Sequence, residues 1–366
     1  MQQFNVDIFS REMAFVYNAS IDATSIDDDY VSASLNIVEV PATQLVENGQ
    51  FIRLQNDSYF FFGLITEVSQ GEYATRIGFK SFLTIFDEEV LFDTAWQGKG
   101  KATTRPTLET VISNFLTETY ISTSDTYQRL PIVVTIDSTI TQTLDWSFGM
   151  RADKETSHYT VANLYSDIIV RALKEYGIAV TVDPIFRNQT IRLTITKKPT
   201  PFKISADQEN VVVKTLKYSD KNIGTNKLTI YNENNFNQSL TFYVHPDKSW
   251  NTTNNNRIKP VVRGIKLVTP QEDTLSSFED AAIEAAYSEL SVSSWDNCIE
   301  LEVFADDINI VPMSLGIGQV VTIYYKEATY TSILTGRILD GNRITLIFGS
   351  DRIEYSKRYK ANGGKK

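Results

Sequence analysis

Hydrophobic and polar residues alternate in three short runs between residues 313 and 352: VVTIYY, YTSILTGRI and RITLIFG. Turn residues separate them, with a Gly-Gln pair at 318–319 before the first run, residues 326–328 between the first two, and Asp-Gly-Asn at 340–342 before the last. An Asp-Gly pair between alternating runs is typical of a β-hairpin, because these residues accept positive φ angles. The pattern predicts an antiparallel meander of three strands.

The same arrangement occurs near the start of the chain, in NGQFIRLQNDSYFFFGLITEVSQGEYATRIGFKSFLTIFD. A Gly-Gln pair at 49–50 again precedes the first run, and turns at 55–57 and 70–71 separate the runs that follow. One strand in each copy carries a glycine, Gly63 in the first and Gly336 in the second. Two copies of one small β unit indicate an internal duplication of a β-barrel.

Between the two copies the hydrophobic period changes to that of a helix. Thr107 is a suitable N-cap for a helix over 108–120. A second helical pattern runs from Thr160 to Tyr176, and Gly177 follows in the position of a C-cap. Two strands, IAVTVDPIF and TIRLTITK, complete this segment, which we interpret as a small α+β domain.

The predicted fold is therefore mainly β with an α+β insert, in which two similar β-barrel domains flank a small α+β domain. The expected domains are a first β-barrel over residues 1–98, the α+β insert over 99–202, a second β-barrel over 203–352 with one helix at 277–290, and a basic flexible tail over 353–366.

Composition limits the classes of function. The 366 residues are 42% hydrophobic and 11% aromatic, which is enough to build the cores of two or three domains. The formal net charge is −10, and the chain lacks the basic blocks that neutralise phosphates in nucleic-acid-binding proteins. An acidic surface instead suits a protein past which DNA slides without binding. We expect no signal peptide and no membrane-spanning segment, because no apolar run approaches about 18–20 residues.

The sequence offers little catalytic chemistry. His158 and His245 have no second ligand at metal-binding spacing, and we interpret both as surface residues. The lone Cys298 is interpreted as a small core residue. The glycines at 316–318 precede a strand rather than a helix, which excludes a phosphate-binding loop. We predict no catalytic residue, no metal, no cofactor and no enzymatic activity.

Two patterns leave alternatives open. The adjacent residues Asp27, Asp28 and Asp29 are expected to form a turn, and the alternative is a calcium site, although three adjacent aspartates lack the alternate spacing of a calcium loop. The second pattern is the run Tyr59, Phe60, Phe61 and Phe62, which interrupts the alternation. Such a run is buried on both faces, either entirely within the chain or partly against another domain or subunit.

The order of these elements resembles the baseplate hub proteins of tailed phages. This gp27-like hub fold also forms the N-terminal hub part of the tail-associated (Tal) proteins of siphophages. The resemblance covers residues 4–355 and follows three stretches: FFFGLITEV…IGFKSFLTIFD, then NLYSDIIVRALKEYGIAVTV, then GIGQVVTIYY…YTSILTGRILDGNRITLIFGSDR. Its motifs are patterns of strands and turns, without a catalytic signature.

The resemblance implies a structural virion protein at the phage tail tip, assembled in the bacterial host cytoplasm and also encoded by prophages. It implies a homotrimer whose six barrels form a ring, so that the sixfold tail tube is adapted to a threefold tip and DNA can pass. The implied partners are a distal tail or tail tube protein on one side and a tail fibre or tip protein on the other.

Two other classes of function compete with this interpretation. A glycan-binding receptor-recognition module of a phage tail would need an exposed aromatic residue, and Trp250 in the Asn-rich segment is the candidate, ahead of Trp96, Trp146 and Trp295. A cell-wall hydrolase would need two carboxylates facing one cleft, for which the sequence gives no specific motif.

Overall fold

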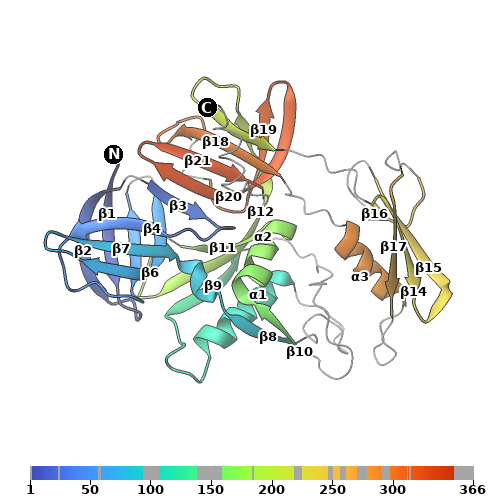
Figure 1. Cartoon of the computed structure of the whole chain (residues 1–366), viewed down its shortest axis with the longest axis horizontal. Helices are drawn as coiled ribbons and strands as arrows, with labels where there is room; N and C mark the ends of the chain where they lie inside the picture. Colours follow the sequence, from blue (N-terminus) through green and yellow to red (C-terminus); the bar gives the residue numbers. More distant parts are fainter. Residues whose placement is uncertain are drawn as a thin grey trace, which may run out of the picture.

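A computed structural model describes the following residues of the chain: 2–23, 25–56, 59–93, 107–137, 159–183, 185–217, 225–245, 250–255, 261–269, 278–290, 297–310, 312 and 315–349. The fold is mainly β with an α+β insert, as the sequence predicts. Figure 1 shows two curled sheets, the insert beneath them, and a smaller unit set apart on the right.

The first sheet is antiparallel, and its strands follow the order β2-β1-β5-β6-β7-β4. Along β1, Phe4, Val6 and Ile8 are completely buried, whereas the intervening Asn5 and Asp7 lie on the outer face. This period of two fixes which face of the strand joins the core. The strands are β1 (Gln2–Phe9), β2 (Phe15–Ala23), β4 (Asn36–Pro41), β5 (Phe51–Gln55), β6 (Phe60–Gln70) and β7 (Ala74–Ser81), and the short helix η1 (Phe82–Phe86) follows them.

The second sheet has the path β11-β12-β19-β20-β21-β18-β13, with β3 paired to β20 and β9 paired to β12. Strands β19, β20 and β21 form the predicted meander. The turn at Lys326 and Glu327 has positive φ at both residues, and Gly341 has φ +61° in the last turn. The strands outside the insert are β3 (Ser25–Asp29), β13 (Val212–Lys217), β18 (Cys298–Phe304), β19 (Gln319–Tyr325), β20 (Ala328–Asp340) and β21 (Arg343–Phe348).

The insert packs helices against strands that continue into the second sheet. Strand β12 pairs with β11 and β9 through its first half and with β19 through its second half, so it passes through position 202, where the sequence places a domain limit. Its register shifts between Lys198 and Phe202, around the prolines at 199 and 201. The elements are β8 (Glu89–Asp93), α1 (Leu108–Leu116), η3 (Thr117–Ile121), β9 (Ile132–Asp137), β10 (Tyr159–Asn163), η4 (Leu164–Val170), α2 (Arg171–Tyr176), β11 (Ile178–Val182) and β12 (Ile191–Ser205).

The helix caps of the insert are partly as predicted. The Thr107 hydroxyl accepts a hydrogen bond from the Thr110 N–H, and Gly177 ends α2 in the left-handed conformation with φ +69°. The predicted start at Thr160 is wrong, because residues 159–163 form β10 and pair with β8. Asn163 is the actual N-cap, and its side chain accepts from the Ser166 N–H. Pairing with a strand distant in sequence overrides the helical pattern there.

A separate unit lies between β13 and β18 in the sequence. Its four strands, in the order β16-β15-β14-β17, pack against α3 around a core of their own. The sequence pattern predicts these strands as part of the second barrel, whereas in the structure they form a sheet of their own. The elements are β14 (Lys227–Asn232), β15 (Asn235–Val244), β16 (Trp250–Asn251), β17 (Arg263–Val268) and α3 (Phe278–Leu290).

The two meanders, β5-β6-β7 and β19-β20-β21, are duplicates in detail. Gly49 donates its N–H to Ile65 O, and Gly318 donates to Leu334 O, both at 2.9 Å and at the same spacing along the chain. Each middle strand then has a β-bulge.

The bulge residue is a threonine in both copies. Thr66 Oγ1 lies 3.4 Å from Gly78 O, and Thr335 Oγ1 lies 3.2 Å from Ile347 O, the equivalent carbonyl. The Thr335 hydroxyl also lies 2.6 Å from Gly349 O, to which it donates its shorter hydrogen bond. Gly63 and Gly336 do not correspond, however, because Gly63 precedes its bulge and Gly336 follows the other. The two copies therefore share the turn and the bulge, whereas their strand glycines occupy different positions.

The paired turn glycines give a matched test of this duplication. Gly49 and Gly318 have φ of +87° and +83°, but an added Cβ has nothing within 4 Å at Gly49 and lies 2.8 Å from Ala179 Cβ at Gly318. We expect Gly49→Ala to cost about 1–2 kcal/mol from backbone strain alone. Gly318→Ala should cost about 1–3 kcal/mol more from overpacking. Urea denaturation of both variants measures the difference, and equal costs would contradict the close contact at Gly318.

Candidate functional site: the junction of the two sheets and the insert

The two duplicated units are joined where β3, from the N-terminal part of the chain, pairs with β20 of the second sheet (Figure 1). In this antiparallel register Asp28 lies opposite Arg337, and Asp29 lies opposite Gly336. An added Cβ at Gly336 would lie 3.1 Å from Asp29 Cα, so the glycine allows the two backbones to approach closely. The junction is therefore a continuous part of the second sheet.

An ion pair crosses this junction. Arg337 Nη2 lies 2.8 Å from Asp28 Oδ2, and the two side chains are 14% and 20% exposed. The ring of Tyr59, from the first sheet, has its centroid 5.5 Å from Arg337 Cζ. Burial lowers the pKa of Arg337, but the attraction of Asp28 outweighs it and holds that pKa above its usual value. The guanidinium is thus held by a carboxylate and an aromatic face.

The three adjacent aspartates lie in strand β3, so the predicted turn is wrong. Asp27 accepts hydrogen bonds from the Ser34 hydroxyl and from the Asp29 N–H, and Asp29 accepts from the Val31 N–H. These carboxylates therefore satisfy the protein's own donors. Among the residues that the structure describes, no group of three His, Cys, Asp or Glu side chains has a geometry that could hold a metal ion.

Tyr30 connects the second sheet to the insert. Its N–H donates to Thr335 O at 3.0 Å, which ties it to the bulge of the second meander. Its carbonyl accepts from the Tyr165 hydroxyl at 2.8 Å, and its own phenolic oxygen accepts from the Val180 N–H at 3.0 Å. The Tyr30 side chain is 5% exposed. Tyr30 therefore holds helix η4 and strand β11 of the insert against the bulge of β20.

The aromatic run at 59–62 lies mainly inside the chain. Tyr59, Phe61 and Phe62 are 3%, 2% and 4% exposed, and Phe60 is half-buried. Phe186 of the insert packs on this run, with its ring centroid 4.7 Å from that of Phe62 and 6.3 Å from that of Phe60. Three of the four side chains therefore contribute to the single-chain core, and a subunit contact through this run would depend on Phe60.

Trp250 belongs to strand β16 rather than to a free loop. It is half-buried, and its ring packs edge-on against Phe242 with centroids 5.5 Å apart. Trp96, Trp146 and Trp295 lie outside the described residues. A glycan contact by Trp250 would therefore use part of a ring that already contributes to the core of the small unit.

The remaining candidates from the sequence are placed as follows. His245 is 6% exposed, so its interpretation as a surface residue is wrong, and its Nε2 lies 3.1 Å from Asn251 Oδ1. His158 lies outside the described residues. Cys298 is completely buried, which confirms it as a core residue. In the described part of the chain no helix has the length and apolar character needed to cross a membrane.

Comparison with known proteins gives structural neighbours but no sequence relatives. No family model and no curated protein matches the chain. A protein of the phage P2 baseplate in its activated conformation has a TM-score of 0.47 and 12% identity, over 97% of this chain and 100% of that one. A 43 kDa tail protein of prophage MuSo2 from Shewanella oneidensis has a TM-score of 0.49 and 13% identity, over 95% and 98%.

The prophage tail protein gp18 from Listeria monocytogenes has a TM-score of 0.46 and 8% identity, over 98% of both chains. These three neighbours are a phage baseplate protein and two prophage tail proteins. At such identities a likeness carries no activity or partner over to this chain.

Buried phenols around the junction predict sensitivity to alkali. Burial raises the pKa of Tyr30, Tyr59 and Tyr165 above the usual value of 10.0. Burial is also the main cause of the raised pKa of Tyr120, and the neighbouring Glu88 carboxylate is the second cause. Because the folded state keeps these protons longer than the unfolded state, their contribution to stability is complete below pH 10 and is lost as the pH rises further.

We expect the free energy of unfolding to fall by up to about 1.4 kcal/mol per pH unit for each such tyrosine above pH 10. Urea denaturation at increasing pH, together with phenolate absorbance, measures this. A phenolate signal that rises fully before any loss of folded structure would contradict the burial of these groups.

Proposed function

We propose that this protein is a structural component of a phage tail tip, a baseplate hub that forms a homotrimeric ring. The observation that carries the proposal is the duplicated meander, with its matching turn glycines and bulge threonines. Three chains with two similar sheets each would present six similar units. Such a ring has threefold symmetry as an assembly and approximates sixfold symmetry in the positions of its sheets.

The junction supports the same proposal mechanically. A hub that joins a sixfold tube to a threefold tip must keep its two units in a fixed relation. The β3–β20 pairing, the Asp28–Arg337 ion pair and the bonds of Tyr30 provide that rigidity within one chain. In this function the ring contacts a distal tail or tail tube protein above and a tail fibre or tip protein below.

DNA passage follows from the ring and from the charge. A net charge of −10 disfavours retention of a polyanion, so DNA would pass through the ring without specific binding. The protein would act in the virion, at the tail tip, after assembly in the cytoplasm of the bacterial host. Its role is geometric, and no catalytic step is assigned to it.

Light scattering of the purified chain at several concentrations, followed by negative-stain microscopy, tests the proposal. We expect a mass three times the 41.4 kDa of one chain and rings with six lobes. A monomer at every concentration, or a dimer, would contradict the ring. Zymography on peptidoglycan tests the hydrolase alternative, and a cleared band would show that the structural role is incomplete.

Within this proposal, Phe60 is the residue of the aromatic run that can contact a neighbouring subunit. Phe60→Asp should convert the trimer to monomers, because a charge would be buried at the contact. Tyr73→Asp, at an 84% exposed side chain in the β6–β7 turn, is the control and should leave the trimer intact. A folded Phe60→Asp variant that remains trimeric would exclude the run from the interface.

A further inference from the structure

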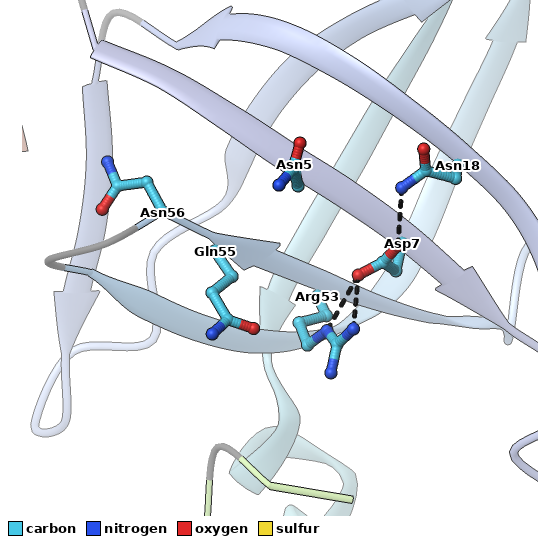
Figure 2. A pocket seen from close by; sticks show the side chains of 6 residues that line it. All are labelled: Asn5, Asp7, Asn18, Arg53, Gln55 and Asn56. Carbon is cyan, nitrogen blue, oxygen red and sulfur yellow. Dashed lines mark hydrogen bonds and ion pairs between the residues drawn. The ribbon is translucent and has the colours of Figure 1, made fainter.

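A polar pocket lies on the outer face of the first sheet, and Arg53 in its lining also contacts Phe186 of the insert. Its volume is about 460 Å³, within the range of small-molecule sites of about 300–1,000 Å³. Figure 2 shows six side chains around it, contributed by β1, β2, β5 and the residue that follows β5. The lining residues are Asn5, Asp7, Asn18, Arg53, Gln55 and Asn56.

The strand register brings these side chains together. On β1, Asn5 and Asp7 both point outward, and they lie opposite Gln55 and Arg53 of β5. Asp7 also lies opposite Asn18 of β2. Residues two positions apart on one strand share a face of the sheet, and so do residues opposite each other on neighbouring strands. The pocket is therefore lined by amide side chains around one charged pair.

The charged pair is held in place by the chain. Asp7 Oδ2 accepts from Arg53 Nε at 2.9 Å and from Nη2 at 2.6 Å, and Asp7 Oδ1 accepts from Asn18 Nδ2 at 2.7 Å. The Phe9 and Phe186 ring centroids lie 5.4 and 5.5 Å from Arg53 Cζ. The Arg53 Nη1 group takes part in neither bond to Asp7, so a fixed donor remains for a ligand.

The amides leave further capacity for hydrogen bonds. Gln55 is half-buried, and its side chain has no hydrogen-bond partner among the residues that the structure describes. The Asn5 carbonyl oxygen accepts from the Ser20 hydroxyl at 3.2 Å, which directs its NH₂ group elsewhere. Gln55 therefore offers an acceptor and two donors, and Asn5 adds its NH₂ donors, a combination that contacts a pair of neighbouring hydroxyls.

We propose that this pocket binds a neutral saccharide of one or two rings. The one carboxylate and the one guanidinium neutralise each other, so neither an anion nor a metal ion is favoured, and the lining offers no apolar surface for a lipid. A hydroxyl-rich ligand uses donors and acceptors alike. Phe15 of β2 packs on Phe9, with ring centroids 6.3 Å apart, and Phe9 in turn faces Arg53. The Phe15 ring is 63% exposed, and the C–H face of a sugar can pack on it.

The pocket adjoins the aromatic run, because Gln55 lies opposite Phe60 in the antiparallel register, so the oligomeric mass of each variant is measured together with its sugar affinity. The test of this binding is saturation-transfer NMR of the full chain with glucose, galactose, rhamnose and N-acetylglucosamine as probes. At least one sugar should receive saturation from the protein. In Gln55→Ala and in the shape-conserving Gln55→Glu, its affinity should fall about tenfold, the effect of one or two lost hydrogen bonds.

Gln70→Ala is the matched control, because Gln70 is an exposed glutamine of the same sheet and lies outside the pocket. It should leave both the signal and the affinity unchanged. No saturation transfer to any of the four sugars, or equal affinities in the Gln55 and Gln70 variants, would overturn the proposal. A change in oligomeric mass in Gln55→Ala with no change in sugar affinity would also overturn it and identify the pocket as a subunit contact.

Discussion

Arg337→Ala should destabilise the protein by about 2–4 kcal/mol, because it leaves the carboxylate of Asp28, which is only 20% exposed, at the junction without its cation. The substitution also removes the guanidinium that faces the ring of Tyr59. Denaturation in urea, followed by tryptophan and tyrosine fluorescence, gives the change in the free energy of unfolding. The size of the effect reflects this partial burial, since solvent screens the uncompensated charge only weakly.

Two controls separate this effect from the general cost of removing a charged residue. Lys266→Ala breaks the Lys266–Glu289 ion pair, whose side chains are 34% and 48% exposed, and should cost about 0–1 kcal/mol. The double substitution Asp28→Leu with Arg337→Met removes both charges and should recover most of the lost stability. If Arg337→Ala lowered the free energy of unfolding no more than Lys266→Ala does, the ion pair would not contribute to the stability of the junction.

Tyr30→Ala should cost about 3–5 kcal/mol, the range for truncating a buried aromatic residue to alanine. It removes the phenolic oxygen that accepts from the Val180 N–H and leaves a cavity between the insert and β20. Tyr30→Phe keeps the ring and should cost about 1–3 kcal/mol, because it leaves the Val180 N–H buried without an acceptor. The same denaturation measurement orders the two variants.

Hydrogen exchange makes the Tyr30 prediction specific. In Tyr30→Phe the Val180 amide should exchange faster than in the original chain, whereas the amides of the small unit around α3 should not change. Tyr73→Ala, at an exposed tyrosine, is the matched control and should alter stability by less than about 0.5 kcal/mol. Unchanged exchange at Val180 would mean that the phenolic oxygen does not hold the insert.

The contrast between the predicted and observed elements has a physical basis. The meanders were predictable because turn chemistry acts over a few residues: Gly318 needs its positive φ, and the pair Lys326 and Glu327 makes a tight turn. The caps at Thr107 and Gly177 are equally local. The segment that begins at Thr160 was mispredicted because its partner, β8, is distant in sequence.

The candidate site depended on contacts between distant segments. Asp28 and Arg337 are separated by most of the chain, and no local pattern pairs them. The sequence predicts a turn at 27–29. In the folded chain these residues lie in a strand, where the Arg337 cation and several N–H and O–H donors compensate the repulsion between the adjacent carboxylates. The amide side chains that line the pocket of the first sheet are likewise brought together only by the register of three strands.

The sequence by itself determined the mainly β character, the two copies of the meander and the helices of the insert. These follow from periodicity and turn residues, which act over short distances along the chain. Tertiary structure alone decided that β3 joins the second sheet, that strands β14 to β17 form a separate sheet, and that most of the aromatic run faces the chain's own core. These outcomes depend on pairing and packing between distant segments, whose energies are not encoded in any local pattern.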